Sequence, residues 1–323
     1  MTGGTGFIGS HTVESLLAEG FSVRCLIRPG RKDIGWLRGL PVEIVESHLT
    51  SSEDLLPHVK DAHYVFHVAG VTKAKSPRSY HRGNVLTTEN LLRACVSAPR
   101  LKKFCFVSSL TACGPSRDGS PVDEDTPNHP ITAYGVSKMQ AEHACAQFFN
   151  KIPIVIVRPP TVYGSRDRDT FEMFRWVGFG IEPIFGDKGK SISLIHVRDL
   201  ARGLIAAAKS PRTAGKTYFA ANIVSYTLHS IISRIAVLSG KRTTPLRFPK
   251  ALLFGVAGLV EALSFIGPRP AVLSVDKARD LTQPHWVCDS SKLLRMVGFT
   301  PQISVDEGLY EALNWYKAQG WLS

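Results

Sequence analysis

The feature that most constrains this chain is a glycine-rich run at its start, Thr-Gly-Gly-Thr-Gly-Phe-Ile-Gly over residues 2–9. The run contains the spacing GxGxxG, counted from Gly4, and the overlapping spacing GxxGxxG, counted from Gly3. Glycine permits a tight turn with positive φ and lets the backbone approach a pyrophosphate, while the N-terminus of the following helix faces the phosphates. The run therefore predicts a dinucleotide-binding loop, although the spacing alone is weak evidence. We expect it to contact the cofactor through Gly3, Gly6, Phe7, Ile8 and Gly9.

The residues after this run alternate between two kinds of pattern. Short β-branched or aromatic stretches predict strands at residues 21–27, 42–45, 63–68, 103–107 and 153–157. Longer stretches with apolar residues at helical spacing predict helices at residues 9–19, 52–60, 80–96 and 133–150. Strands alternating with helices are typical of a parallel sheet with crossover helices. The pattern predicts an α/β fold with a Rossmann-type, doubly wound parallel sheet.

Glycine and proline become dense after residue 160, and strand-like pieces at residues 191–195 and 217–220 are separated by helices. We therefore expect residues 1–160 to form an NAD(P)-binding domain, to which residues 197–210 return. Residues 161–323 would be mainly a smaller C-terminal lobe that binds substrate. Only Met1 and Thr2 precede the glycine run, so we expect the first, central strand to be truncated because upstream residues are missing.

Composition excludes several classes of protein. The 323 residues are 44% hydrophobic and carry a net charge of +12. The basic residues form no run of five, so we expect no nucleic-acid partner. The six cysteines form no CxxC pair, no secretory signal is visible, and His63, His67 and His81 lack the spacing of a metal site. We expect a cytoplasmic protein with reduced cysteines and no metal.

Residues 251–267 form the longest apolar stretch, which contains Glu261. It is shorter than the roughly 20 residues that span a bilayer. We interpret it as a packed amphipathic helix. Contact with a membrane surface is the weaker alternative, supported only by the flanking Lys250 and Arg269.

Arg28 favours one form of the cofactor. Dinucleotide sites that prefer NAD place an acidic residue about 20 positions after the glycines, where it binds the ribose 2′-hydroxyl. Arg28 occupies that place, 19 residues after Gly9. A guanidinium suits a 2′-phosphate, so the sequence favours NADP, with NAD possible. The alternative is that Arg28 is a solvated residue at the end of a strand.

Tyr134 and Lys138 are four residues apart, and therefore lie on one face of a helix that Thr132 is placed to cap. An ammonium beside a phenol favours the phenolate, which lowers the phenol pKa toward the range useful for proton exchange with an alcohol or ketone. Ser109 follows a predicted strand and is placed to hydrogen-bond the same substrate oxygen. Its alternative role is to cap backbone groups.

These motifs together resemble the extended short-chain dehydrogenase/reductase family, also called the NAD-dependent epimerase/dehydratase family, over nearly the whole chain. The motifs that carry the resemblance are the run at 2–9, Asp61 to Gly70 ("DxVxHxAA"), Asn84, Ser109, Tyr134 with Lys138, Arg158 to Gly164 ("RPxxVYG") and His196 to Asp199 ("HVxDxA"). The resemblance adds Ala69, Gly70, Val107, Pro159 and Pro160 to the expected cofactor contacts. One departure is Ser47-His48-Leu49, where the family usually has a "GDL" segment with an acid near the adenine.

The resemblance implies that Tyr134 is the acid/base, that Lys138 lowers its pKa and holds the nicotinamide ribose, and that Ser109 polarises the substrate oxygen. It implies hydride transfer to or from a secondary alcohol or ketone. Nucleotide-sugar members usually have an Arg where this chain has Ile192, and the nearby Lys188 or Lys190 is the alternative candidate for that contact. That departure, together with the apolar C-terminal part, resembles the dihydroflavonol-reductase and 3β-hydroxysteroid-dehydrogenase branches and implies a fairly apolar small-molecule substrate.

Three functions remain open at this stage. The leading one is the oxidoreductase, the second is a nucleotide-sugar epimerase or dehydratase, and the third is a cofactor-binding regulator without chemistry. A homodimer is compatible with each of them.

Overall fold

The computed structural model describes residues 1–185, 189–267 and 270–322. Its centre is a parallel sheet in which Thr2 bridges Leu26 on one side and His67 on the other. The Thr2 amide donates to the Phe66 carbonyl at 3.0 Å, and the Leu26 amide donates to the Met1 carbonyl at 2.9 Å. The strands run in the order β2 (Val42–Glu46), β1 (Val23–Ile27), Thr2, β3 (Tyr64–His67), β4 (Lys103–Val107), β5 (Ile154–Arg158) and β10 (Lys216–Phe219). This order confirms the predicted doubly wound α/β fold.

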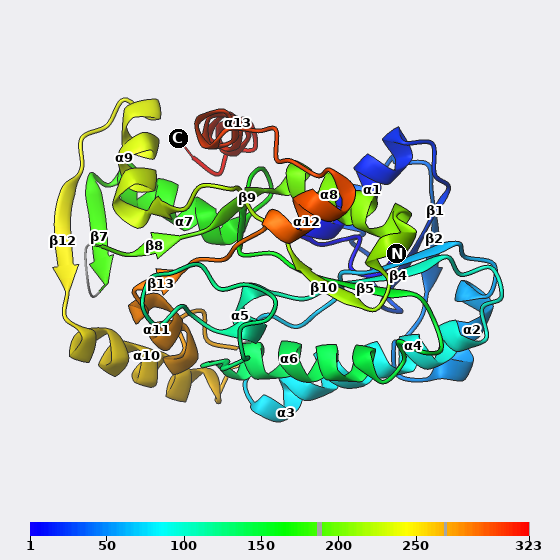
Figure 1. Cartoon of the computed structure of the whole chain (residues 1–323). Helices are drawn as coiled ribbons and strands as arrows, with labels where there is room; N and C mark the ends of the chain where they lie inside the picture. Colours follow the sequence, from blue (N-terminus) through cyan, green and yellow to red (C-terminus); the bar gives the residue numbers. More distant parts are fainter. Residues whose placement is uncertain (186–188, 268–269, 323) are drawn as a thin grey trace.

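Helices cover both faces of the sheet (Figure 1). On one face, α1 (Phe7–Ala18), α8 (Val197–Lys209) and α12 (Ser291–Val297) pack against the sheet through a buried apolar cluster. On the other face, α2 (Ser52–Val59), α4 (Thr87–Val96) and α6 (Ala133–Ala146) form a second cluster. Alternate residues of β4 divide between the two: Cys105 and Val107 face the first, Phe104 and Phe106 the second. Near-continuous apolar strands are what a sheet buried on both faces requires.

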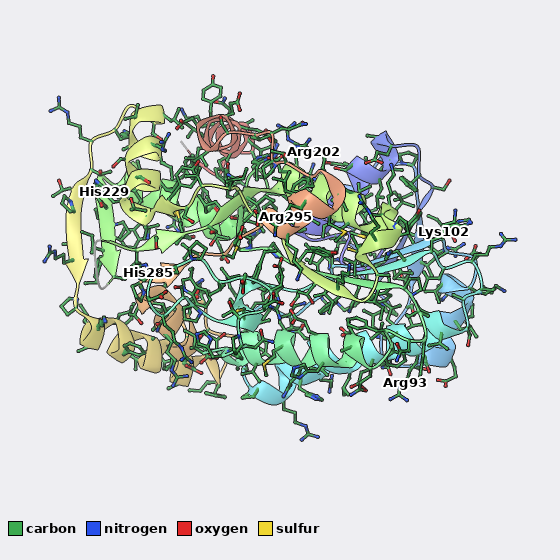
Figure 2. All side chains as sticks on the ribbon, viewed as in Figure 1. Arg93, Lys102, Arg202, His229, His285 and Arg295 are labelled. Atoms are coloured by element: carbon green, nitrogen blue, oxygen red, sulfur yellow. The ribbon has the colours of Figure 1, made fainter. Side chains whose placement is uncertain are left out.

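The lobe is built from small sheets and helices at the other end of the molecule. In Figure 2, His229 and His285 mark the lobe, whereas Arg93 and Lys102 project from the opposite end. The lobe strands are β6 (Thr161–Tyr163), β7 (Ile181–Phe185), β8 (Ser191–Ile192), β9 (Leu194–His196), β11 (Tyr226–Thr227), β12 (Thr244–Phe248) and β13 (His285–Trp286). The lobe helices are α7 (Arg168–Gly178), α9 (Leu228–Leu238), α10 (Lys250–Ser264), α11 (Val275–Thr282) and α13 (Val305–Ala318). A third apolar cluster joins α7, α9 and α13.

Two sequence expectations differ from the structure in this half. The predicted division of the chain places the strand expected at 217–220 in the C-terminal lobe. That strand is β10, which belongs instead to the main sheet, where it pairs with β5 and buries Tyr218 and Phe219 fully. The piece expected at 191–195 divides into β8 and β9, which belong to different sheets. The division of the chain at residue 160 stays a prediction.

The apolar helix expected at 251–267 is α10, but it is not packed on all its apolar positions. Leu253 and Ala257 are buried against α11, whereas Leu259 is 62% exposed and Ile266 is 88% exposed. In the described part of the chain, every helix is too short or too polar to cross a membrane. All six cysteines are buried and free, as the sequence predicts.

Candidate active site and cofactor loop

The glycine run forms the turn between Thr2 and α1. Gly3 has φ +76°, and a Cβ at that position would lie 2.6 Å from the Ala69 amide nitrogen. A Cβ on Gly9 would lie 2.1 Å from the Gly3 carbonyl oxygen, so the helix packs directly on the loop. The first turn of α1 has no side-chain cap and no acidic residue. Its amides therefore form a positive, uncapped helix end that suits an anion, and the residues of the predicted cofactor loop fit a pyrophosphate.

A buried hydrogen-bonded row holds this loop in place. His67 Nδ1 lies 2.7 Å from Thr2 Oγ1, and His67 Nε2 lies 2.9 Å from Thr88 Oγ1. The Ala69 amide donates to Thr2 Oγ1 at 3.3 Å. Burial lowers the pKa of His67 to about 3, so the imidazole is neutral. His67 is thus a structural residue, and no group of metal-ligating side chains occurs among the described residues.

Ser109 lies just beyond β4 and begins the short helix α5 (Leu110–Cys113). Its Oγ accepts hydrogen bonds from the Thr111 amide at 3.2 Å and from Thr111 Oγ1 at 2.9 Å. The predicted capping role is therefore present. Because both contacts use the oxygen as acceptor, the Ser109 proton is left to be donated elsewhere.

Tyr134 and Lys138 lie on the first turns of α6, which Thr132 caps as predicted: its Oγ1 accepts from the Gly135 amide at 3.0 Å. Burial raises the pKa of Tyr134 to about 12, and the neighbouring Ser109 hydroxyl acts in the opposite direction. This is a correction, because the sequence led us to expect a lowered pKa. The Lys138 ammonium donates to the Val107 carbonyl at 2.7 Å, and burial lowers its own pKa to about 8. Burial therefore sets the direction of the phenol pKa, and the group that opposes it is Ser109 rather than the expected ammonium.

A buried ion pair, which sequence reasoning missed, supports the same helix face. Glu142 follows Lys138 by one further turn and accepts from Arg158 Nε at 2.9 Å and Nη2 at 2.5 Å. The two side chains are 6% and 5% exposed. Ser108 donates to the same carboxylate. The available signal was the four-residue repeat of Tyr134, Lys138 and Glu142 on one helix.

Asn84 lies in a π-helical segment, His81–Leu86, that interrupts the helix expected at 80–96. Its Nδ2 donates to Ser137 Oγ at 2.8 Å, and its Oδ1 accepts from the Val71 amide at 2.6 Å. Asn84 thereby connects the loop after β3 to α6. Single π-helical turns inside α-helices often occur at functional sites.

The remaining predicted residues lie around this centre. Arg28 follows the last residue of β1, and its side chain is exposed. Pro159 accepts a hydrogen bond from the Leu110 amide at 2.8 Å, and Pro160 follows it before β6. Gly70 lies against Asn84, since a Cβ there would be 3.3 Å from Asn84 Oδ1. Lys190 is buried and described, whereas Lys188 lies outside the described residues.

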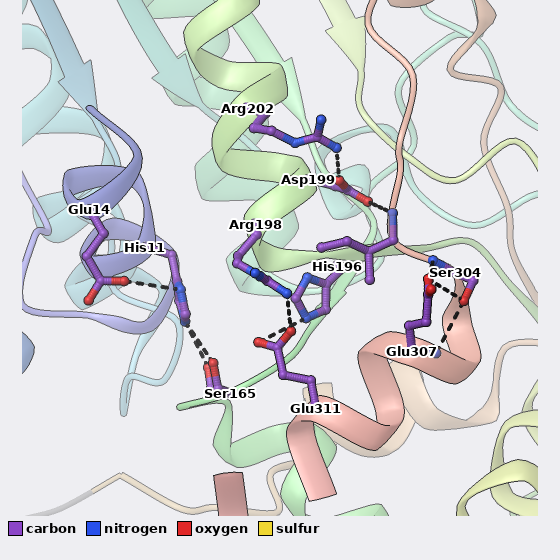
Figure 3. Close-up of polar contacts among 11 residues, drawn as sticks. His11, Glu14, Ser165, His196, Arg198, Asp199, Arg202, Ser304, Glu307 and Glu311 are labelled. Atoms are coloured by element: carbon purple, nitrogen blue, oxygen red, sulfur yellow. Dashed lines mark hydrogen bonds and ion pairs between the residues drawn. The ribbon is translucent and has the colours of Figure 1, made fainter. Parts of the chain in front are cut away.

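A second network fixes α1 against the lobe (Figure 3). His11 Nε2 lies 3.1 Å from the Ser165 carbonyl, and His196 lies 3.9 Å from a Glu311 oxygen of α13. The pKa of each histidine is lowered to about 4, chiefly by burial, so both are neutral. Asp199 is fully buried and accepts from the Ile303 amide at 2.9 Å. His11 thereby holds α1 against the segment after β6, and Asp199 holds α8 against the segment that leads into α13.

The sequence model of the NAD dependent epimerase/dehydratase family matches residues 1–221. The chain belongs to this family. The resemblance inferred from its motifs is thereby confirmed, and family membership makes the protein an NAD(P)-dependent enzyme of oxidoreductase or epimerase type.

Relatives match over almost the whole chain. A ceramide reductase of Caulobacter vibrioides is 29% identical over 100% of this chain and 95% of its own length. A putative dihydroflavonol 4-reductase of Synechocystis is 30% identical with the same coverage. Among solved structures, the UDP-glucuronic acid 4-epimerase of Bacillus cereus in complex with UDP-glucuronic acid and NAD has a TM-score of 0.78. It is 24% identical over 98% of both chains, so it supports the fold alone.

Proposed function

We propose that this protein is an NADP-dependent oxidoreductase that interconverts a secondary alcohol and a ketone of a fairly apolar substrate. The observation that carries the proposal is the arrangement of Ser109 and Tyr134. The two hydroxyls face each other beyond the carboxyl end of β4, next to the loop that suits a pyrophosphate. Open α/β sheets bind their ligands at this edge.

Tyr134 is the proton donor or acceptor in this proposal. With a pKa of about 12 it is protonated at neutral pH, which is the form that delivers a proton to a carbonyl oxygen as it becomes an alcohol. Ser109 donates its free proton to the same oxygen, because its own lone pairs are used by Thr111. The Lys138 ammonium is mostly charged below its pKa of about 8, so it places a positive charge one helical turn from Tyr134.

The cofactor would bind with its pyrophosphate at Gly3, Gly6 and the first turn of α1, and it supplies the hydride. Arg28 would pair with a 2′-phosphate, because its exposed guanidinium stands where NAD-preferring sites carry an acid. The other predicted contacts are Ala69, Gly70, Val107, Pro159 and Pro160. Of these, Val107 acts through its carbonyl, which positions the Lys138 ammonium.

The proposed substrate class rests on Ile192 and on the relatives. Ile192 lies on β8, at the position where a diphosphate-binding arginine is expected in nucleotide-sugar enzymes, and an alkyl side chain offers a phosphate no hydrogen bond. The two relatives above are named as reductases of ceramide and of dihydroflavonol, neither of which carries a nucleotide. Both observations support an apolar substrate.

The test is turnover of NADPH with long-chain ketones, followed by nicotinamide absorbance. Tyr134→Phe should bind NADPH normally and lose about 10² to 10⁴ in turnover, the usual contribution of a general acid or base. Tyr80→Phe is the matched control, since its ring centroid lies 6.2 Å from that of Tyr134. It should retain most activity. If Tyr134→Phe kept more than about a tenth of the rate, the acid/base role would belong to another group.

A nucleotide-sugar epimerase or dehydratase is the second candidate, and Lys190 favours it. This side chain is 6% exposed, and burial lowers its pKa to about 8. A buried ammonium in the lobe proposed to bind substrate would suit a diphosphate. In a thermal-shift screen with UDP, GDP and dTDP, a ligand at about 100 times its dissociation constant stabilises by roughly 2.7 kcal/mol. A shift of that size that Lys190→Met abolishes would replace the apolar substrate by a nucleotide sugar.

A further inference from the structure

Half of the strongly exposed large apolar side chains of the described chain lie in one short segment. Of the 16 such residues, eight fall between residues 246 and 272: Leu246, Leu252, Val256, Leu259, Leu263, Phe265, Ile266 and Val272. Five of them recur on α10 and its end at spacings of four, three, four and three, which forms one stripe along a helix. We call Leu252, Val256, Leu259, Leu263 and Ile266 the α10 stripe. Contiguous exposed apolar surface of this kind marks an interaction site.

The opposite side of α10 packs on α11 and contains the only acid of the segment that leads into and forms α10. Within residues 239–267, all of them described, Glu261 is the only acidic residue. Its carboxylate is turned toward α11, where it accepts from the Val275 amide at 2.8 Å. In Figure 1, α10 lies at the lower left edge of the molecule with no element outside it. The stripe is therefore an unpartnered face.

The surroundings of the stripe are basic. Arg247 near the end of β12 and Lys250 at the start of α10 are both exposed, whereas Lys241 and Arg242 precede β12 at its other end (Figure 1). The loop and helix at residues 71–82 carry four more cations, of which Lys73 pairs with Asp169 at 3.2 Å. Lys75 of that segment bonds to the Gly267 carbonyl at the end of α10. This combination suits an anionic lipid surface: the apolar side chains would contact the acyl chains, and the surrounding cations would contact the phosphates.

The position of α10 connects this face to the candidate active site. Its partner helix α11 contacts the start of α6, where Asp276 accepts from the Ala133 amide at 2.6 Å. Ala133 directly precedes Tyr134. One helix, α11, therefore separates a surface that seats α10 from the start of α6, where Tyr134 lies.

We propose that the α10 stripe docks this protein on the surface of an anionic lipid bilayer. With 15 residues and about 1.5 Å of rise per residue, α10 is about 22 Å long, less than the roughly 30 Å of a bilayer core, so it lies in the interface plane. A second copy of the chain is the poorer occupant, because a symmetric contact would bring the same basic residues of two copies together. The docking does not depend on the proposed reaction.

The test is flotation of the whole protein with lipid vesicles, without substrate or cofactor. We expect binding to vesicles of phosphatidylcholine and phosphatidylglycerol in equal amounts, and much less binding to phosphatidylcholine alone. Leu259→Ser/Leu263→Ser should weaken binding at least about tenfold, because two leucines no longer enter the acyl region. Arg247→Gln/Lys250→Gln should weaken binding to the anionic vesicles by roughly fivefold per cation and reduce its salt dependence.

The matched control is Val237→Ser, which removes an apolar side chain that is 80% exposed on α9. It should leave vesicle binding unchanged. The depth of docking can be read directly: because all six native cysteines are buried, Leu263→Cys offers one accessible thiol for an environment-sensitive fluorophore. Its emission should shift to the blue when anionic vesicles are added.

Three results would overturn the proposal. The first is that the wild type floats with neither kind of vesicle. The second is that Val237→Ser weakens binding as much as the double leucine variant does. The third is that the wild type is a dimer in light scattering that the double leucine variant converts to a monomer, because a second copy would then cover the stripe.

Discussion

Removing the carboxylate of Glu142 should both destabilise the protein and alter the site. Glu142→Gln leaves the Arg158 guanidinium buried without its counter-ion, while Arg158 Nη1 already has no hydrogen-bond partner among the described residues. Removing one member of a buried pair typically costs about 3 to 5 kcal/mol. For a chain of this size that cost corresponds to a melting temperature roughly 5 to 10 °C lower.

The same substitution should change the pH profile. The charge of Glu142 raises the pKa of Lys138, which burial lowers to about 8. Without that charge the pKa of Lys138 falls further, so the loss of activity on the alkaline side should begin at a lower pH. A merely structural defect would reduce activity at every pH without moving this limb.

The assay is thermal unfolding together with a pH–rate series. Glu19→Gln is the matched control: Glu19 pairs with Lys209 at 2.9 Å, but the side chains are 36% and 53% exposed, so the loss should be below about 1 kcal/mol. Glu142→Gln/Arg158→Met should recover part of the stability, because no buried charge is then left alone. A Glu142→Gln protein as stable as the control would refute the reasoning.

Three further predictions concern the cofactor and stability. Arg28→Ala should remove a roughly tenfold to hundredfold preference for NADPH over NADH in fluorescence titration, and equal affinities of the wild type for both would contradict the role of Arg28. Gly9→Ala should weaken NADPH binding at least about tenfold, since its Cβ would lie 2.1 Å from the Gly3 carbonyl, whereas Gly178→Ala, with nothing within 4 Å, should not. Stability should fall as pH falls from 6.5 toward 3, because the unfolded chain binds a proton that neutral His67, with its pKa of about 3, does not. Melting curves should show a shallower fall for His67→Gln, and an equal slope would place the effect elsewhere.

The sequence predicted the fold well because the fold is set by local patterns. Apolar strands alternating with amphipathic helices allow few arrangements other than a doubly wound sheet. Gly3 and Gly9 make close contacts that no larger residue can make, and the side chain of Thr132 caps the start of a helix. Each of these features depends on residues a few positions apart, so it can be predicted without knowledge of the tertiary structure.

The parts that the sequence did not predict depend on contacts between distant segments. Arg158 and Glu142 belong to different elements, and nothing local shows that they meet. Helical periodicity shows that α10 has an apolar face, but it does not show that Leu253 and Ala257 are the only residues of α10 that become buried. The pKa of Tyr134 depends on how completely the surrounding chain buries it, which reversed the expected direction.

The row of Tyr134, Lys138 and Glu142 shows how one helix can set the charge of a site. Burial opposes charge on both of the first two groups, raising the pKa of the phenol and lowering that of the ammonium. At the phenol, burial exceeds the opposing effect of the Ser109 hydroxyl, so the phenol stays protonated. The ammonium has Glu142 one turn away, and this charge raises its pKa against burial. Glu142 is in turn held by Arg158 from the adjacent strand. The positive charge at Lys138 therefore depends on an ion pair that lies away from the reacting groups, which is why the Glu142 variant tests the site and not only the stability of the fold.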